Sequence, residues 1–290
     1  MKPDAVIVSV NDRPEYYQYV GLCIAAWERV GIQPVLIVVK DDEWSALPKQ
    51  NRAQIARIRA YPDVSEEYGD LMVGDIDLIP LGPDAFHALP TRYHGILTAF
   101  GYDAYVHLHE GARRFPGCYM VADATTWARL IPQAIRALGP ESTEADIVKV
   151  FGCTSTTTTY MPDLLHDAQA RRAHPSHRQF CEERLMFGLL WAAGHAVSIN
   201  RVARGWDTLG MGGDGPIVRA RQRLDRINWP SNEAMRMHLH KPVKMIDAHM
   251  PRPMRYHIEA VRPIYDHIGI QCKPTTWEEV INHYEPTYSP

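Results

Sequence analysis

The sequence has few cysteines, and they lack the spacing that a disulfide framework or a thiolate zinc site requires. There are five, an odd number, and no two of them form a Cys-x-x-Cys pair. They lie far apart, at Cys23, Cys118, Cys153, Cys181 and Cys272. This spacing argues against both kinds of site and favours free thiols in a reducing compartment.

The sequence also lacks a long apolar segment and an excess of charge of either sign. No stretch approaches the ~20 apolar residues of a membrane-spanning helix, and the apolar run at residues 5–10 is too short for a signal peptide. The 31 Lys and Arg against 34 Asp and Glu give a net charge of −3. The chain therefore lacks the excess of basic residues that is typical of a general nucleic-acid binder. We therefore expect a cytoplasmic protein with no transmembrane segment and no nucleic-acid partner, and leave open a peripheral attachment to a membrane.

The composition that remains is typical of a globular protein. The 290 residues are 46% hydrophobic and 22% charged, which allows one large α/β domain or two medium ones. Because we find no internal repeat and no clear linker, we expect a single domain over residues 1–290. The 14 histidines suggest a metal site, and the 22 prolines suggest long ordered loops.

The N-terminal part of the chain has the pattern of a strand, a helix and a second strand. Residues 5–10 and 34–39 are continuous apolar, β-branched runs, as in parallel strands covered on both faces. Between them, apolar residues recur at helical spacing, and Gly31 ends the helix. The stripe consists of Tyr17, Val20, Ile24 and Trp27. This βαβ unit predicts an open α/β sheet.

Further elements follow the same reasoning. We expect strands at 71–79, 94–100, 117–122 and 196–202, and helices at 50–60, 83–88, 124–137 and 178–193. In the helix at 50–60, Ile55 and Ile58 are expected to face the core and the arginines to face solvent. Beyond residue 205 the periodicity is weak, so we expect an irregular C-terminal segment.

Two aspartates, Asp75 and Asp77, interrupt the apolar run at 71–79. In an extended backbone, side chains at i and i+2 share a face, so both carboxylates should point the same way at the end of a strand. Two carboxylates held this close repel each other, which costs free energy unless a positive charge lies between them. Mg²⁺ or Mn²⁺ could supply that charge, because both prefer oxygen ligands. The carboxyl ends of strands are also where open α/β sheets bind ligands. The simpler alternative is that both aspartates are solvated at a strand-to-loop junction.

Several segments together resemble the nucleotide-sugar glycosyltransferases of the GT-A fold. They are Asn11 after the first strand, 26–31 (AWERVG), 56–58 (ARI) and 73–80 (VGDIDLIP). The resemblance covers roughly residues 5–200, and its one specific motif is the D-x-D of Asp75 and Asp77. It implies a GT-A-like α/β domain with a Rossmann-like, mostly parallel central sheet flanked by helices.

The resemblance also implies a division of the chain and a function. Residues 1–100 would form the nucleotide-sugar-binding half, 101–204 the acceptor-side half, and the segment 205–290 would complete the site. Asp77 would ligate Mn²⁺ or Mg²⁺ on the donor diphosphate, and Asp75, also a candidate metal ligand, would face the ribose and sugar. The expected reaction moves a hexose from a nucleotide sugar, UDP-linked by default, to a hydroxyl of a glycan or small acceptor.

A third metal ligand, often a histidine, comes from a late segment in such enzymes. We favour His249, because Asp247-Ala248-His249 places two possible ligands on a short turn before prolines. The pair His238 and His240 is the second choice. An ordinary surface or core histidine is the alternative in each case.

Glu182 and Glu183 begin the helix expected at 178–193. By resemblance, one of them would deprotonate the acceptor hydroxyl, as the base of an inverting enzyme does from a comparable helix start. The alternative is that they only stabilise the first helical turn through the helix dipole.

The remaining candidates would contact the donor. Arg57 could reach the diphosphate, although exposed helical arginines are commoner. Asn11 and Asp12 end the first strand, where they would meet the nucleobase or ribose, and Tyr17 could stack there or belong to the core stripe. Asp123 would accept from a sugar hydroxyl or, alternatively, cap the following helix.

Two other functions remain open. A phosphatase of the haloacid dehalogenase type also has a D-x-D at the end of a strand, but it requires Thr or Val two residues after the second Asp and an N-terminal location, whereas Leu78-Ile79 follow here. The other is a non-catalytic sugar- or protein-binding module on the same fold.

Overall fold

A computed structural model of the chain describes the elements that position the candidate site. It covers residues 2–11, 14–40, 52–53, 56–57, 60–83, 86, 97–100, 119–130, 196–200, 207–208, 223–224, 247–251 and 257–270. Within these ranges, no helix is both long enough and apolar enough to cross a membrane.

The centre of the fold is a seven-stranded sheet with the order β2-β1-β3-β6-β5-β7-β8. Its strands are β1 (Ala5–Asn11), β2 (Gln33–Val39), β3 (Asp70–Asp75), β5 (Leu97–Phe100), β6 (Tyr119–Asp123), β7 (Ala196–Asn200) and β8 (Asp207–Thr208). β1 pairs in parallel with both β2 and β3, and β5 pairs in parallel with β7. β6 and β8 run antiparallel to their neighbours. The prediction of an α/β fold with a mostly parallel central sheet is therefore confirmed.

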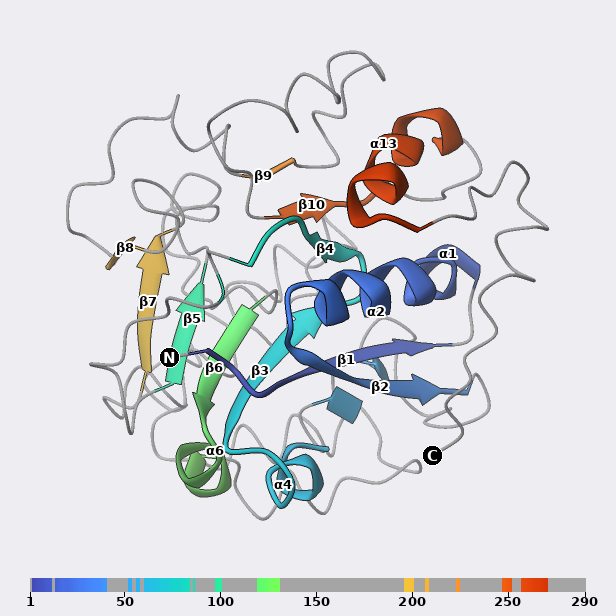
Figure 1. Ribbon diagram of the computed structural model, residues 1–290. Helices are drawn as coiled ribbons and strands as arrows, with labels where there is room; N and C mark the ends of the chain where they lie inside the picture. Colours follow the sequence, from blue (N-terminus) through green and yellow to red (C-terminus); the bar gives the residue numbers. More distant parts are fainter. Residues whose placement is uncertain are drawn as a thin grey trace, which may run out of the picture.

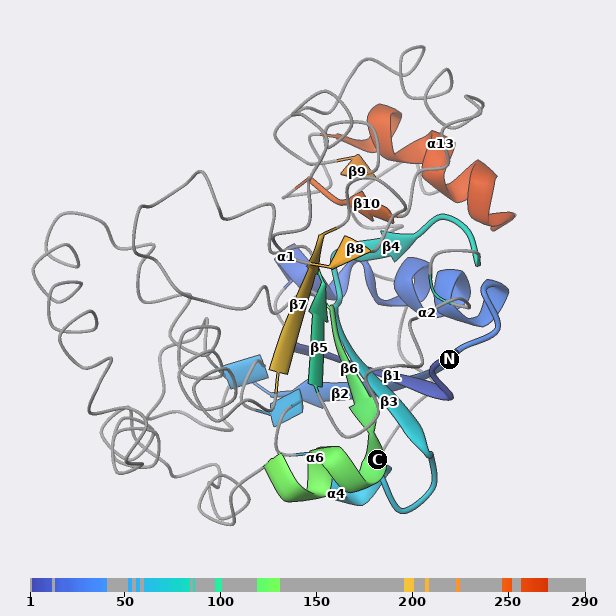
Figure 2. The ribbon, with the colours of Figure 1, turned by 90° about the vertical axis from the view of Figure 1, so that its left-hand side faces the viewer.

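The predicted helix between β1 and β2 is present as α1 (Pro14–Tyr17) and α2 (Val20–Arg29). Proline at the first position of α1 costs no hydrogen bond, and Gly31 follows α2 with a φ of 73°, a conformation that glycine adopts freely. α2 lies against one face of the central sheet (Figures 1 and 2). Its buried residues are Val20, Leu22, Cys23, Ala26 and Trp27, which pack on Val6, Val8 and Val10 in the core cluster.

A second, three-stranded sheet has the order β4-β10-β9. It consists of β4 (Leu78–Pro80), β10 (Asp247–His249) and β9 (Arg223–Leu224). This small sheet and α13 (Ile258–Ile268) lie at one end of the central sheet, whereas α4 (Tyr61–Val64) and α6 (Ala124–Leu130) lie at the other (Figures 1 and 2). Late residues of the chain thus pack beside the end of β3.

The predicted strand over 71–79 is wrong in one respect. The run is two strands, β3 and β4, and Ile76 and Asp77 form a turn between them. The sequence pattern does not reveal the turn because Ile76 is itself buried, at 4% exposed. The apolar character therefore continues while the chain leaves the central sheet and joins the small one.

Among the described residues after 205, the helix α13 is a regular element that the sequence pattern did not predict. Pro263 lies inside this helix, and a proline normally ends a helical pattern. Four buried residues at helical spacing nevertheless hold α13 on the core: Val261, Ile264, Tyr265 and Ile268. Gly269, with a φ of 85°, ends it.

Candidate functional site

The carboxyl ends of β1 and β3 bring polar side chains to one face of the central sheet. Ser9 and Asp75 are register partners in this parallel pair, so their side chains point to the same face. A Cβ built on Gly74 would lie 3.7 Å from the Trp27 ring of α2. Because neighbouring residues of a strand point to opposite faces, Asp75 and Ser9 face away from α2.

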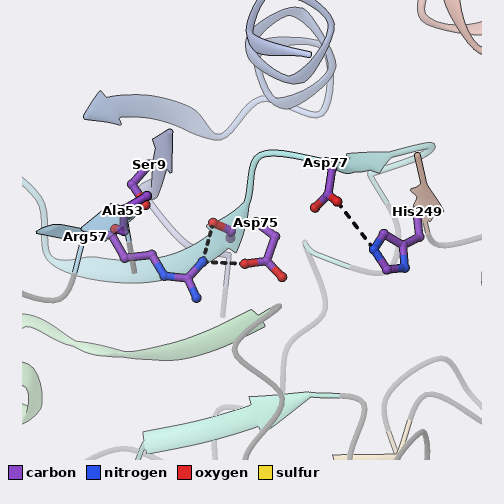
Figure 3. Close-up of polar contacts among 7 residues, drawn as sticks. Ser9, Ala53, Arg57, Asp75, Asp77 and His249 are labelled. Atoms are coloured by element: carbon purple, nitrogen blue, oxygen red, sulfur yellow. Dashed lines mark hydrogen bonds and ion pairs between the residues drawn. The ribbon is translucent and has the colours of Figure 1, made fainter. Parts of the chain in front are cut away.

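Arg57 occupies this face and holds Asp75. Its Nη1 donates to the Gly74 carbonyl oxygen at 3.1 Å and to Asp75 Oδ1 at 2.5 Å (Figure 3). Arg57 is 2% exposed, so the prediction that the arginines of this segment face solvent is wrong for Arg57. The burial of a guanidinium is acceptable here because a carboxylate and a carbonyl oxygen receive its hydrogen bonds.

Ser9 fixes the segment that carries Arg57. Its hydroxyl donates to the Ala53 carbonyl oxygen at 2.7 Å (Figure 3). Residues 52–53 and 56–57 are helical, so this contact ties the segment to β1 beside the position that Asp75 occupies on β3. The sequence signal for Ser9 was available, since it is the one hydroxyl residue in the apolar run AVIVSV.

Asp77 lies in the turn between β3 and β4, where its side chain meets His249. Asp77 Oδ2 is 3.5 Å from His249 Nε2, and the two side chains are 7% and 18% exposed (Figure 3). β10 pairs antiparallel with β4 so that His249 is opposite Leu78, and the Met250 N–H donates to the Asp77 carbonyl oxygen at 2.8 Å. His249 therefore lies on a strand rather than on the predicted turn.

The two aspartates thus differ in their surroundings. The side chain of Asp75 is 35% exposed and is paired with Arg57, whereas Asp77 is nearly buried beside an imidazole. The expectation that one continuous strand aligns both carboxylates is wrong, because the turn at Ile76 and Asp77 separates them. In Figure 3 each carboxylate faces its own partner.

The side chains of Asp77 and His249 carry atoms that can ligate a divalent cation, and a substrate would supply the rest of the coordination. A carboxylate oxygen and an imidazole nitrogen are both divalent-metal ligands. Among the described residues, no group of three or more His, Cys, Asp or Glu could hold a metal by itself. Asp77 and His249 therefore fit the type of site in which one or two protein ligands are completed by phosphate oxygens and water.

Two other predicted donor contacts can be placed. Asn11 ends β1 and is 7% exposed, and strand alternation puts it on the same face as Ser9. Tyr17 is half-buried and packs against the core cluster, in agreement with its alternative interpretation as part of the core stripe. Asp12, Glu182, Glu183, His238 and His240 lie outside the described residues.

For Asp123, the structure agrees with its alternative interpretation as the cap of the following helix. It is the register partner of Asp70, at the start of β3, and therefore lies at the opposite end of that strand from Asp75. Its carboxylate accepts from the Thr126 N–H at 2.8 Å and from the Thr126 hydroxyl at 2.6 Å. Asp123 caps α6 rather than contacting a ligand beside Asp75.

Tyr19 is a buried neighbour of the site that the sequence did not reveal. Its hydroxyl donates to the Pro251 carbonyl oxygen, two residues after His249. Burial raises the pKa of Tyr19, and the negative charge of Asp77 raises it further. Burial also raises the pKa of the Cys23 thiol, with smaller contributions from Asp77 and Asp75. No local pattern could identify Tyr19, since its partner is 232 residues away.

Comparison with known proteins finds a distant likeness among solved structures. No family model matches this sequence, and no curated protein matches it. Among solved structures, the chain is similar to galactosyltransferase LgtC in complex with donor and acceptor sugar analogs, with a TM-score of 0.43 and 13% identity over 95% of this chain and 99% of that chain. A likeness at this level does not identify an activity, which has to follow from the residues of this chain.

Proposed function

We propose that this protein is a metal-dependent glycosyltransferase that moves a sugar from a nucleotide-diphosphate sugar to a hydroxyl of a glycan or small acceptor. The observation that supports this most is the approach of His249 Nε2 to Asp77 Oδ2, at 3.5 Å, next to the end of β3. That end of the strand also carries Asp75, held by Arg57. Ligands of open α/β sheets bind at the carboxyl ends of strands.

In this proposal Asp77 and His249 hold Mn²⁺ or Mg²⁺. A bound cation would stabilise the negative charge that develops on the leaving nucleoside diphosphate. Imidazole is a better ligand for Mn²⁺ than for Mg²⁺, which favours Mn²⁺. With two protein ligands, the cation should bind weakly alone and more tightly together with a diphosphate.

Asp75 and Arg57 have a different task in the same proposal. Arg57 binds Oδ1 of Asp75, and the 35% exposure of this side chain leaves room for a hydroxyl to approach the carboxylate. We therefore assign Asp75 to the ribose or sugar hydroxyls of the donor. Arg57, buried at 2% exposed, would orient Asp75 instead of contacting the diphosphate as expected from the sequence.

A thermal-shift screen of UDP-, GDP- and dTDP-sugars, each with and without Mn²⁺, tests the proposal. Ligand at 100 times its Kd adds about 2.7 kcal/mol to the free energy of unfolding, which raises the Tm by about 5 °C in a protein of this size. We expect such a rise for one donor with Mn²⁺, and a much smaller one with EDTA. No rise for any donor would contradict the proposal.

A second assay separates an enzyme from a sugar-binding module on the same fold. Many transferases slowly transfer their donor sugar to water, so Mn²⁺-dependent release of nucleoside diphosphate from the stabilising donor indicates catalysis. Binding without any release over long incubation would favour the binding module. Release of phosphate from simple phosphate esters would instead favour the phosphatase alternative.

A further inference from the structure

Tyr19 connects the N-terminal helices to the strand that carries His249. It lies between α1 and α2 and is 0% exposed. Its hydroxyl donates to the carbonyl oxygen of Pro251, which is 232 residues further along the chain. A buried hydroxyl requires a partner, and here the partner is the backbone immediately after the candidate site.

Consecutive backbone contacts hold this part of the chain. His249 is opposite Leu78 in the β10–β4 pair, and the Met250 N–H donates to the Asp77 carbonyl oxygen at 2.8 Å. Both contacts tie His249 to the segment that carries Asp77. The Tyr19 contact at Pro251 is different, because it ties the same segment to the helices that cover the central sheet.

The surroundings of Tyr19 keep its hydroxyl protonated, so that it is uncharged and can donate a hydrogen bond. Burial and the charge of Asp77 both raise the pKa of Tyr19, so its hydroxyl stays protonated at neutral and mildly alkaline pH. Tyr19 can therefore fix the backbone beside Asp77 without adding a second negative charge to the site.

We infer that Tyr19 is a positioning residue of the cation site: its hydrogen bond to Pro251 fixes the end of β10 so that the His249 imidazole faces Asp77. The inference rests on the proposed function, in which Asp77 and His249 ligate the cation. Tyr19 touches neither cation nor donor in this account. It acts through the backbone of residues 249–251.

The first test needs no metal. Tyr19→Phe removes the hydroxyl and keeps the ring. Thr126→Val is the matched control, because it also removes a buried hydroxyl. That hydroxyl is bonded to Asp123, at the far end of β3. We expect the Met250 amide to exchange with solvent about tenfold faster in Tyr19→Phe, as expected for one lost hydrogen bond, and at the wild-type rate in Thr126→Val. An unchanged Met250 rate in Tyr19→Phe would overturn the inference.

The second test is a cycle of Tyr19→Phe, His249→Ala and the double variant, with Mn²⁺ binding measured in the presence of UDP. We expect Tyr19→Phe to weaken Mn²⁺ binding about tenfold, the range for residues that orient a metal ligand. In the His249→Ala background it should have no further effect. An equal loss in both backgrounds would overturn the inference, since Tyr19 would not then act through His249.

Another hydrogen-bond donor at position 19 should restore the binding of Mn²⁺. Incorporation of 4-aminophenylalanine there supplies an N–H in place of the O–H, and we expect it to recover most of the Mn²⁺ affinity and the slow exchange of Met250. Recovery of stability without recovery of either readout would mean a purely structural role. If the wild-type protein binds no Mn²⁺ with UDP, the proposed function fails for this pair of ligands, and the metal-free exchange test still decides whether Tyr19 fixes the chain after His249.

Discussion

His249 Nε2 lies 3.5 Å from Asp77 Oδ2, although the two residues come from distant parts of the sequence. The pairing of β10 with β4 brings them together, and the turn after β3 directs Asp77 toward the small sheet instead of along the central one. The D-x-D motif is thereby divided. Asp75 is paired with Arg57, and Asp77 with His249.

Arg57→Gln should weaken donor binding and lower stability. The variant leaves Asp75 and the Gly74 carbonyl oxygen without their strongest donor, which should cost about 1–3 kcal/mol of unfolding free energy. We expect nucleotide-sugar affinity to fall about tenfold, and Arg57→Lys to restore part of it, because both hydrogen bonds come from the single nitrogen Nη1 and an ammonium also carries several donors. Urea denaturation and calorimetry measure the two effects.

Arg29→Gln is the control for this prediction, since Arg29 is an exposed arginine in the last turn of α2. It should change stability by less than about 0.5 kcal/mol. Equal behaviour of the two variants would contradict the role given to Arg57.

Gly74→Ala should destabilise the end of β3. A Cβ at this position would lie 3.1 Å from Val6 Cγ2 and 3.5 Å from Val8 Cγ1, and overpacking of this kind costs about 1–3 kcal/mol. Gly82→Ala is the matched control, because a Cβ there meets no atom within 4 Å. Chemical denaturation of both variants checks this. A Gly74→Ala protein as stable as Gly82→Ala would mean that the packing of Gly74 against Val6 and Val8 of β1 is looser than described.

Stability should fall as the pH rises above about 9. Burial raises the pKa of Tyr19 and of Cys23, so the unfolded chain loses these protons at a lower pH than the folded protein does. Each group then contributes a slope of up to about −1.4 kcal/mol per pH unit above its unfolded pKa. Urea denaturation between pH 8 and about 10.5 should give a shallower decline for the double variant Tyr19→Phe, Cys23→Ala. A decline as steep as that of the wild type would show that other groups cause it.

The βαβ unit was predicted correctly because the residues that determine it are close together in the sequence. An apolar run, a helical stripe and a glycine with positive φ determine β1, α2 and β2 without distant contacts. The turn at Asp77 was missed because the buried Ile76 continues the apolar pattern. α13 was missed because Pro263 interrupts an otherwise regular stripe.

The candidate site was only partly predictable, for a related reason. Asp75 and Asp77 stand out as charges in an apolar segment, and the resemblance to GT-A enzymes pointed to His249. The partner of each carboxylate depends on packing between distant segments. An arginine on an amphipathic helix is normally assigned to solvent, and no spacing rule places Arg57 under β3 or Tyr19 beside Pro251.

Glu182 and Glu183 stay a prediction from the resemblance, since both lie outside the described residues. If one is the catalytic base, its Gln variant should lose turnover by roughly 10²–10⁴-fold with donor binding unchanged. The other Gln variant serves as the control. Steady-state kinetics together with donor titration separates the two effects. Full turnover in both variants would exclude a base at these positions and favour a retaining mechanism.

The most direct test of the central claim is a calorimetric titration of UDP with Mn²⁺ into the wild type, Asp77→Asn and Asp63→Asn. Asp63 is an exposed aspartate on α4, at the opposite end of the central sheet. We predict that Asp77→Asn folds normally and loses at least about 100-fold in Mn²⁺-dependent affinity, while Asp63→Asn binds like the wild type. Unchanged Mn²⁺-dependent affinity in Asp77→Asn would contradict the assignment of Asp77 and His249 as the cation site.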